Sequence, residues 1–131
     1  MKWWQRYPKA FDPAMVGKYP ANTKSGGGYF WDEVLEYRVW CHPELGAPDH
    51  GEGDDYFYAF PDFRTANSFS KRTEGAEPPL ALVLQREHIN EPEPEIFEHV
   101  TIDRITEWKT KWLSGSRRTK NSISDFLARF E

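Results

Sequence analysis

A triple glycine leads directly into an alternating, aromatic-rich segment between Ser25 and Cys41, and this segment constrains the fold more than any other. From residue 33 onwards, successive side chains of an extended chain point to opposite faces. One face carries Leu35, Tyr37, Val39 and Cys41, and the other carries Glu36, Arg38 and Trp40. The pattern predicts a β-strand over residues 33–41, with one face against a core rich in aromatic side chains.

Three further segments have strand character. Residues 55–60 are an aromatic run followed at once by Pro61, which predicts a second strand. Residues 80–84 are apolar on both faces, so we expect the central strand of the sheet there. Strand character resumes between residues 97 and 108. The intervening residues 91–95 alternate Glu and Pro, and they predict a stiff, solvent-facing acidic turn because each proline removes a backbone donor.

Two helices are expected. Asp62 is a suitable N-cap for a helix through about Arg72, because a carboxylate can accept from the free amides of the first turn. Residues 122–130 predict a short terminal helix that packs through an apolar stripe. The stripe consists of Ile123, Phe126, Leu127 and Phe130. The sequence therefore predicts a single compact α+β domain over residues 1–131, with an antiparallel or mixed sheet of four to five strands, one internal helix and a C-terminal helix.

The first 28 residues combine prolines with aromatic side chains, so we expect an irregular arm that packs on the core. The aromatic residues are Trp3, Trp4, Tyr7, Phe11 and Tyr19. Asp12 and Pro13 predict a short helical turn, since Asp caps helices and proline suits the first helical position. The glycines at 26–28 predict a hinge, although Lys24 with glycine amides is also what a phosphate cradle uses.

Composition limits the possible partners and the environment. The 131 residues are enough to bury a core without disulfides, and the single cysteine, Cys41, provides neither a disulfide framework nor a thiolate zinc cluster. A formal charge of −4 argues against a nucleic-acid partner and against a polybasic membrane-surface protein. No apolar run approaches the ~18 residues of a membrane span. We therefore expect a cytoplasmic protein without nucleic-acid or membrane partners.

Arg38 is the leading candidate for a functional residue, because it lies in an otherwise apolar strand where an unpaired guanidinium would be costly. Its partner is either a protein carboxylate, with Glu107 the leading candidate, or an anionic ligand. The order of elements, with the aromatic strand of Tyr56 between Arg38 and Glu107, resembles ADP-ribosyltransferase-like folds. In those folds an arginine and a glutamate at such positions bind NAD. We expect structural pairing of Arg38 with Glu107 and keep NAD handling as an alternative.

Two other segments carry groups that are typical of ligand sites. Arg86 follows the expected central strand, where it either lines a cleft or simply ends the strand in solvent. The loop of residues 42–55 holds His42, His50 and several carboxylates, which are ligand types of zinc and iron sites. Their spacing matches no compact ligand motif, so we expect this loop to be solvated and metal-free. The candidate ligand-binding residues are Arg38, Tyr56, Arg86 and Glu107.

Several short stretches are distributed along most of the chain, between residues 3 and 108. They are Trp3-Trp4, Tyr7-Pro8, Phe11–Pro13, Val16-Gly17, Tyr19–Thr23, Ser25–Phe30, Asp32–Trp40, Gly75–Gln85 and Ile105–Trp108. In these stretches the chain resembles a small bacterial family of uncharacterised proteins, some labelled as acetyltransferases of the GNAT superfamily. The resemblance implies acetyl-CoA-dependent acyl transfer. The segment Gln85–Pro92, where GNAT enzymes seat the pyrophosphate, contains no glycine, so acetyl transfer is an alternative here.

The function that these observations favour is a non-catalytic binding or interaction module that uses exposed aromatic side chains and acidic loops. Its partner would be a protein or a small-molecule ligand, and no cofactor is expected. Two enzyme classes are the alternatives. One is nucleotide or NAD handling through Arg38 and Glu107, and the other is acetyl-CoA-dependent transfer.

Overall fold

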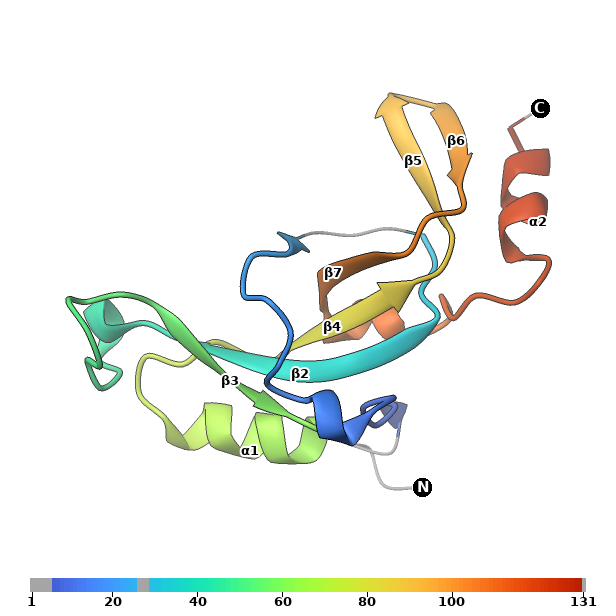
Figure 1. Cartoon of the computed structure of the whole chain (residues 1–131). Helices are drawn as coiled ribbons and strands as arrows, with labels where there is room; N and C mark the ends of the chain where they lie inside the picture. Colours follow the sequence, from blue (N-terminus) through green and yellow to red (C-terminus); the bar gives the residue numbers. More distant parts are fainter. Residues whose placement is uncertain (1–5, 26–28, 131) are drawn as a thin grey trace.

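The computed structural model describes residues 6–25 and 29–130 and has the expected α+β architecture (Figure 1). Its main sheet has five strands in the spatial order β1-β7-β4-β2-β3. β1 is parallel to β7 and the other neighbours are antiparallel, so the sheet is mixed. The strands are β1 (Lys24–Ser25), β2 (Glu33–Cys41), β3 (Tyr56–Phe60), β4 (Leu80–Gln85) and β7 (Arg104–Lys109). The predictions of a strand over residues 33–41 and of a central strand at residues 80–84 are confirmed.

The remaining elements surround this sheet. A two-stranded hairpin, β5–β6, projects from the end of β4 and β7, and helix α2 lies beside it (Figure 1). These elements are η2 (Pro13–Met15), η3 (Pro43–Leu45), α1 (Phe63–Arg72), β5 (His88–Glu93), β6 (Ile96–Val100), η4 (Thr110–Leu113) and α2 (Ser122–Ala128), where η denotes a 3-10 helix.

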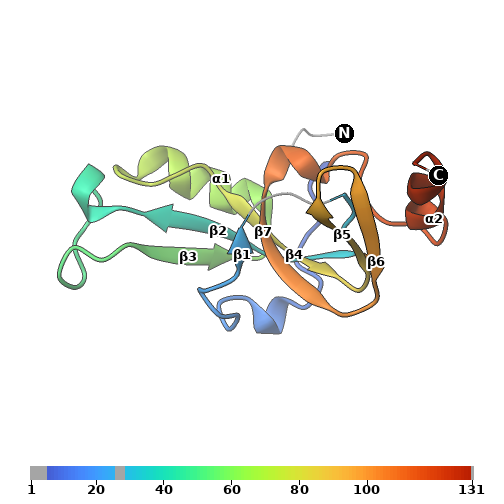
Figure 2. The same ribbon diagram turned by 90° about the horizontal axis from the view of Figure 1, so that it is seen from above.

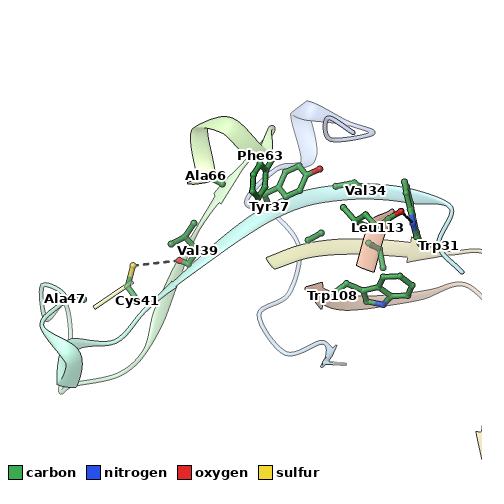
Figure 3. Close-up of a cluster of buried hydrophobic side chains, with 12 residues drawn as sticks. Trp31, Val34, Tyr37, Val39, Cys41, Ala47, Phe63, Ala66, Trp108 and Leu113 are labelled. Carbon is green, nitrogen blue, oxygen red and sulfur yellow. Dashed lines mark hydrogen bonds between the residues drawn. The ribbon is translucent and has the colours of Figure 1, made fainter. Parts of the chain in front are cut away.

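Different parts of the chain cover the two faces of the main sheet (Figure 2). Helix α1 covers the face that carries Tyr37, whose ring centroid lies 5.8 Å from that of Phe63. The N-terminal arm crosses the opposite face, which carries Arg38. Figure 3 shows the apolar core on the α1 side. Its buried members are Trp31, Val34, Tyr37, Val39, Cys41, Ala47, Phe63, Ala66, Ala81, Val83, Trp108 and Leu113. A register shift between Val34 and Glu36 places Val34 in this core in place of the expected Leu35.

Helix α1 begins and ends where its sequence indicates. The Asp62 carboxylate accepts a hydrogen bond from the Thr65 amide at 2.8 Å, which satisfies one free donor of the first turn. Phe63 and Ala66 are buried against the sheet. The helix ends at Arg72, so the helix predicted from Asp62 through about Arg72 is confirmed.

The β2–β3 hairpin extends beyond the rest of the sheet and ends in the loop of residues 42–55, which we call the acidic loop (Figure 1). The base of the acidic loop is fixed to the segment that follows α1, because the His42 amide donates to the Gly75 carbonyl at 2.9 Å. Gly75 has a φ of +78°, and a Cβ there would lie 2.4 Å from the backbone nitrogen of Ala47. Only glycine fits this position without strain, so the acidic loop has a fixed base.

Backbone hydrogen bonds hold the N-terminal arm against the sheet. The Ala10 amide donates to the Pro61 carbonyl at 2.8 Å, and Ala10 is buried. Asp12 caps η2 by accepting from the Ala14 amide, as its sequence predicts. Trp3, Trp4 and the expected hinge at residues 26–28 lie outside the described residues.

Two sequence predictions for the second half of the chain were only partly correct. Residues 91–95 are all exposed, as expected for a solvent-facing acidic connection, but the turn itself is shorter because β5 continues to Glu93. Pro92 is accommodated within β5 by a register irregularity, where the ladder does not use its missing donor. The strand character expected between residues 97 and 108 belongs to two strands, β6 and β7, since residues 101–103 carry the chain from the hairpin into the main sheet.

The expected C-terminal helix is present and packs by its apolar stripe. Ile123 is buried, and the Phe126 ring centroid lies 4.7 Å from that of Tyr29 and 5.1 Å from that of Phe97. Phe130 remains 53% exposed at the end of the chain. Helix α2 therefore joins the β5–β6 hairpin through aromatic contacts.

Candidate binding site

Arg38 is completely buried on the arm side of the sheet, and each of its guanidinium nitrogens donates a hydrogen bond. Nε donates to Glu36 Oε2 at 2.7 Å, and Nη1 donates to Glu107 Oε2 at 3.0 Å. Nη2 donates to the Pro20 carbonyl at 2.6 Å, and the Phe57 ring centroid lies 4.3 Å from the guanidinium carbon. The expected pair of Arg38 and Glu107 is therefore present within a larger network, which joins the arm to the sheet.

This network contains two carboxylates for one guanidinium. Glu107 Oε2 also accepts from Trp40 Nε1 at 2.9 Å, and Glu36 Oε1 accepts from the Gly17 amide at 2.9 Å. These neutral donors stabilise the negative charge that Arg38 leaves uncompensated. Glu36 was expected on the same strand face as Arg38 but was not predicted as a partner of that residue. Because protein groups occupy its donors and its side chain has no exposed surface, Arg38 holds the arm in place.

The other two predicted site residues lie at opposite ends of β2, apart from Arg38. Tyr56 points to the α1 face of the sheet, and its hydroxyl donates to the Pro48 carbonyl at 2.6 Å. Arg86 follows β4, where its Nη1 lies 3.6 Å from Glu33 Oε1. The four candidate residues therefore do not form one site. NAD handling through Arg38 and Glu107 stays a prediction.

In the acidic loop, His42 lies between two carboxylates. Its Nδ1 is 2.9 Å from Asp55 Oδ1, and its Nε2 is 3.4 Å from Glu77 Oε1. The hydrogen bond with Asp55 raises the pKa of His42, although burial opposes the shift. His42, Glu44 and Asp55 offer ligand atoms within 4.8 Å of one another, so a metal ion would compete with a proton on this ring. The expectation of a metal-free loop stays a prediction.

A groove of about 660 Å³ lies between the arm and the exposed side of α1, and we call it the α1 groove. This volume is within the range of about 300–1,000 Å³ that is common for ligand sites. The arm contributes Tyr7, Pro8 and Lys9, and the helix side contributes Asp62, Arg64, Thr65, Ser68 and Arg72. The helix wall follows from periodicity, because residues 64, 68 and 72 recur every four positions and share one face.

Buried contacts position the two walls of the α1 groove. The Tyr7 ring packs on Phe63, with ring centroids 4.0 Å apart. The Tyr37 hydroxyl donates to the Pro8 carbonyl. Because Phe63 and Tyr37 both belong to the core, the arm wall has a fixed place beside the first turn of α1. The groove is therefore part of the folded structure before any ligand binds.

Cations dominate the lining of the α1 groove. Its one acid, Asp62, is already used as the N-cap of α1. Within the described residues, neither Lys9 nor Arg72 forms an ion pair. The hydroxyl groups of Thr65 and Ser68 add neutral donors to the helix wall. The groove therefore presents charged and neutral hydrogen-bond donors that suit an anionic ligand.

Sequence reasoning did not identify this groove. The four-residue spacing of Ser68 and Arg72 within the predicted helix was a usable signal, since such positions are neighbours on a helix. No local signal marks Lys9, which reaches the groove through the packing of Tyr7 on Phe63. The site therefore depends on tertiary structure as well as on helix periodicity.

No protein-family model, curated protein or solved structure matches this chain. Among the described residues, no helix has both the length and the apolar character needed to cross a membrane. The function must therefore be argued from the geometry of the groove and of the charged networks.

Proposed function

We propose that the protein is a non-catalytic binding module and that the α1 groove binds an acidic segment of a partner protein. The observation that carries this proposal is a preformed groove in which Lys9 and Arg72, from two different elements, have no ion-pair partner among the described residues. A concave surface with excess positive charge attracts anions. The Arg38 network supports the non-catalytic part, because its charges hold the arm that forms one wall.

The dimensions of the groove favour an extended peptide. Arg64 and Arg72 are eight residues apart in α1, which corresponds to about 12 Å at the helical rise. An extended chain rises about 3.3 Å per residue, so roughly four residues would span this distance. Lys9 lies near the start of α1, because neighbouring Tyr7 packs on Phe63. A peptide with carboxylates three or four residues apart would therefore meet Lys9 near one end of the groove and Arg72 at the other.

We expect this binding to be weak and sensitive to salt. Exposed ion pairs contribute about 0.2–1 kcal/mol each, and salt screens them. Dissociation constants between about 10 µM and 1 mM correspond to the affinity of such a contact. Nucleic acid is a less suitable partner, because a chain with a net charge of −4 is repelled by a polyanion at long range.

Calorimetric titration with hexaglutamate at low salt tests the proposal. The variant Lys9→Gln/Arg72→Gln should bind about tenfold more weakly, which corresponds to about 0.7 kcal/mol for each lost pair. The matched control is Lys120→Gln/Arg129→Gln, which removes the same charge from an exposed region near α2 and should bind as the wild type does. Equal affinity of the two variants would refute the groove as the site. Tighter binding of hexathymidylate than of hexaglutamate would refute the partner class.

A further inference from the structure

We propose that the acidic segment bound by the α1 groove is the acidic loop of a second copy of this chain, so that copies associate head to tail. This inference rests on the proposed function, because it names the partner of the same groove.

The acidic loop has the charge that the groove requires. Residues 42–55 contain five acidic residues and no lysine or arginine. The acidic residues are Glu44, Asp49, Glu52, Asp54 and Asp55, and all five are exposed. The α1 groove is lined by Lys9, Arg64 and Arg72 and by a single carboxylate. The two surfaces are therefore complementary in charge.

The apex of the acidic loop is a tight turn that projects into solvent. Asp49 Oδ1 accepts hydrogen bonds from the Gly51 and Gly53 amides, both at 3.0 Å, and this closes a tight turn. Glu52, between those glycines, has a φ of +52°. A Cβ built at Gly51 or Gly53 would meet no atom within 4 Å, so open space surrounds the apex. Glu52 and Asp54 are free to enter a groove on another molecule.

The acidic loop cannot span the groove of its own molecule from Arg72 to Lys9. Its base is fixed beside the end of α1 by the bond between His42 and Gly75, and the loop continues away from that end (Figures 1 and 2). The arm wall of the groove lies at the opposite end of α1, where Tyr7 packs on Phe63. A contact of the acidic loop with both Lys9 and Arg72 is therefore intermolecular.

The second acidic turn of the chain is a poorer occupant. In the β5–β6 hairpin, Glu91 Oε1 accepts from the Tyr29 hydroxyl at 2.6 Å, and Glu91 Oε2 accepts from the Glu95 amide at 2.9 Å. That carboxylate is already satisfied within its own molecule. The side chains of Glu52 and Asp54 have no such hydrogen bonds among the described residues. They therefore give up no intramolecular hydrogen bond when they enter the groove.

Each copy offers one loop and one groove, and these are different surfaces. Such a heterologous contact generates open chains or rings. Two copies with a charge of −4 each repel one another, so we expect association only at high protein concentration. Added salt should dissolve the assemblies because the contact is made of exposed charges.

Sedimentation velocity of complementary variants tests this arrangement. The loop variant is Glu52→Gln/Asp54→Asn, which keeps Asp49 for the turn, and the groove variant is Lys9→Gln/Arg72→Gln. Wild-type protein should increase in mass with concentration at low salt, whereas each variant alone should remain a monomer. An equimolar mixture should form a 1:1 dimer and nothing larger, because it contains one intact loop and one intact groove. The control Glu93→Gln/Asp103→Asn should assemble like the wild type.

The outcomes separate this inference from the proposed function. A wild-type protein that binds hexaglutamate in the groove but stays monomeric at all concentrations would overturn the inference alone. A mixture of the loop and groove variants that remains monomeric while the wild type assembles would also overturn it. A groove variant that keeps full affinity for hexaglutamate would overturn the proposed function itself.

Discussion

Replacing Arg38 with methionine removes the only cation of the buried network. Two carboxylates, Glu36 and Glu107, then remain without their shared donor, and the Pro20 carbonyl of the arm loses its partner. Removal of one side of a buried ion pair costs roughly 3–5 kcal/mol, because an uncompensated charge stays buried. Whole domains are stable by only about 5–15 kcal/mol. Arg38→Met should therefore lose a large fraction of the free energy of unfolding.

The opposite substitution should be much milder. In Glu107→Gln, the amide oxygen can still accept from Arg38 and Trp40, and the remaining pair of Arg38 and Glu36 is electrically neutral. We expect a loss of about 1–2 kcal/mol, which is the difference between charge-assisted and neutral hydrogen bonds. The double substitution should cost less than the sum of the single ones, because only one carboxylate then remains without a cation.

Urea unfolding at neutral pH, followed by tryptophan fluorescence, measures these differences. Arg38→Lys keeps the charge but cannot donate in a fork to three acceptors, so its stability should be intermediate. The control is Arg117→Met, whose side chain is 57% exposed and lies 3.4 Å from Glu33, and it should change stability by less than about 1 kcal/mol. The reasoning is refuted if Arg38→Met costs no more than Arg117→Met, or if Glu107→Gln is as costly as Arg38→Met.

Three further predictions concern the base of the acidic loop and α2. Gly75→Ala should destabilise by roughly 1–3 kcal/mol from backbone strain, with more from the clash with Ala47, and an unchanged urea midpoint would contradict the tight packing there. The pKa of His42 is raised by Asp55, so its contribution to stability should be complete below the unfolded pKa of about 6.5 and lost as pH rises through the folded value. Unfolding midpoints of wild type and His42→Gln across this pH range measure the loss, and parallel curves would rule it out. Phe126→Ala should cost about 2 kcal/mol, because its ring is only partly buried, and a stability equal to wild type would show that α2 is not part of the core.

Local patterns in the sequence were sufficient where one physical rule dominates. The alternation over residues 33–41 predicted β2, because a strand with two different faces has period two. Asp62 predicted the start of α1, because a side chain that satisfies a free amide is a local signal. The continuous apolar run at residues 80–84 placed β4 in the middle of the sheet.

The sequence-based predictions were wrong or incomplete where the structure depends on contacts between segments that are far apart in the sequence. The register shift between Val34 and Glu36 places Val34 in the cluster on the α1 side, whereas Leu35 is buried outside that cluster, and no local pattern indicates this. The candidate site shows the same limit, since Arg72 follows from helix periodicity but Lys9 does not. The arm brings Lys9 to α1 by the packing of aromatic rings that are far apart in the sequence.

The most direct test of the α1 groove is an amide NMR titration of the wild-type protein with hexaglutamate at low salt. The account predicts saturable shifts that are largest at Lys9, Thr65, Ser68 and Arg72, and that disappear when salt is added. Absence of shifts at these residues, or larger shifts around the exposed cations near α2, would contradict the proposal that this groove binds an acidic partner.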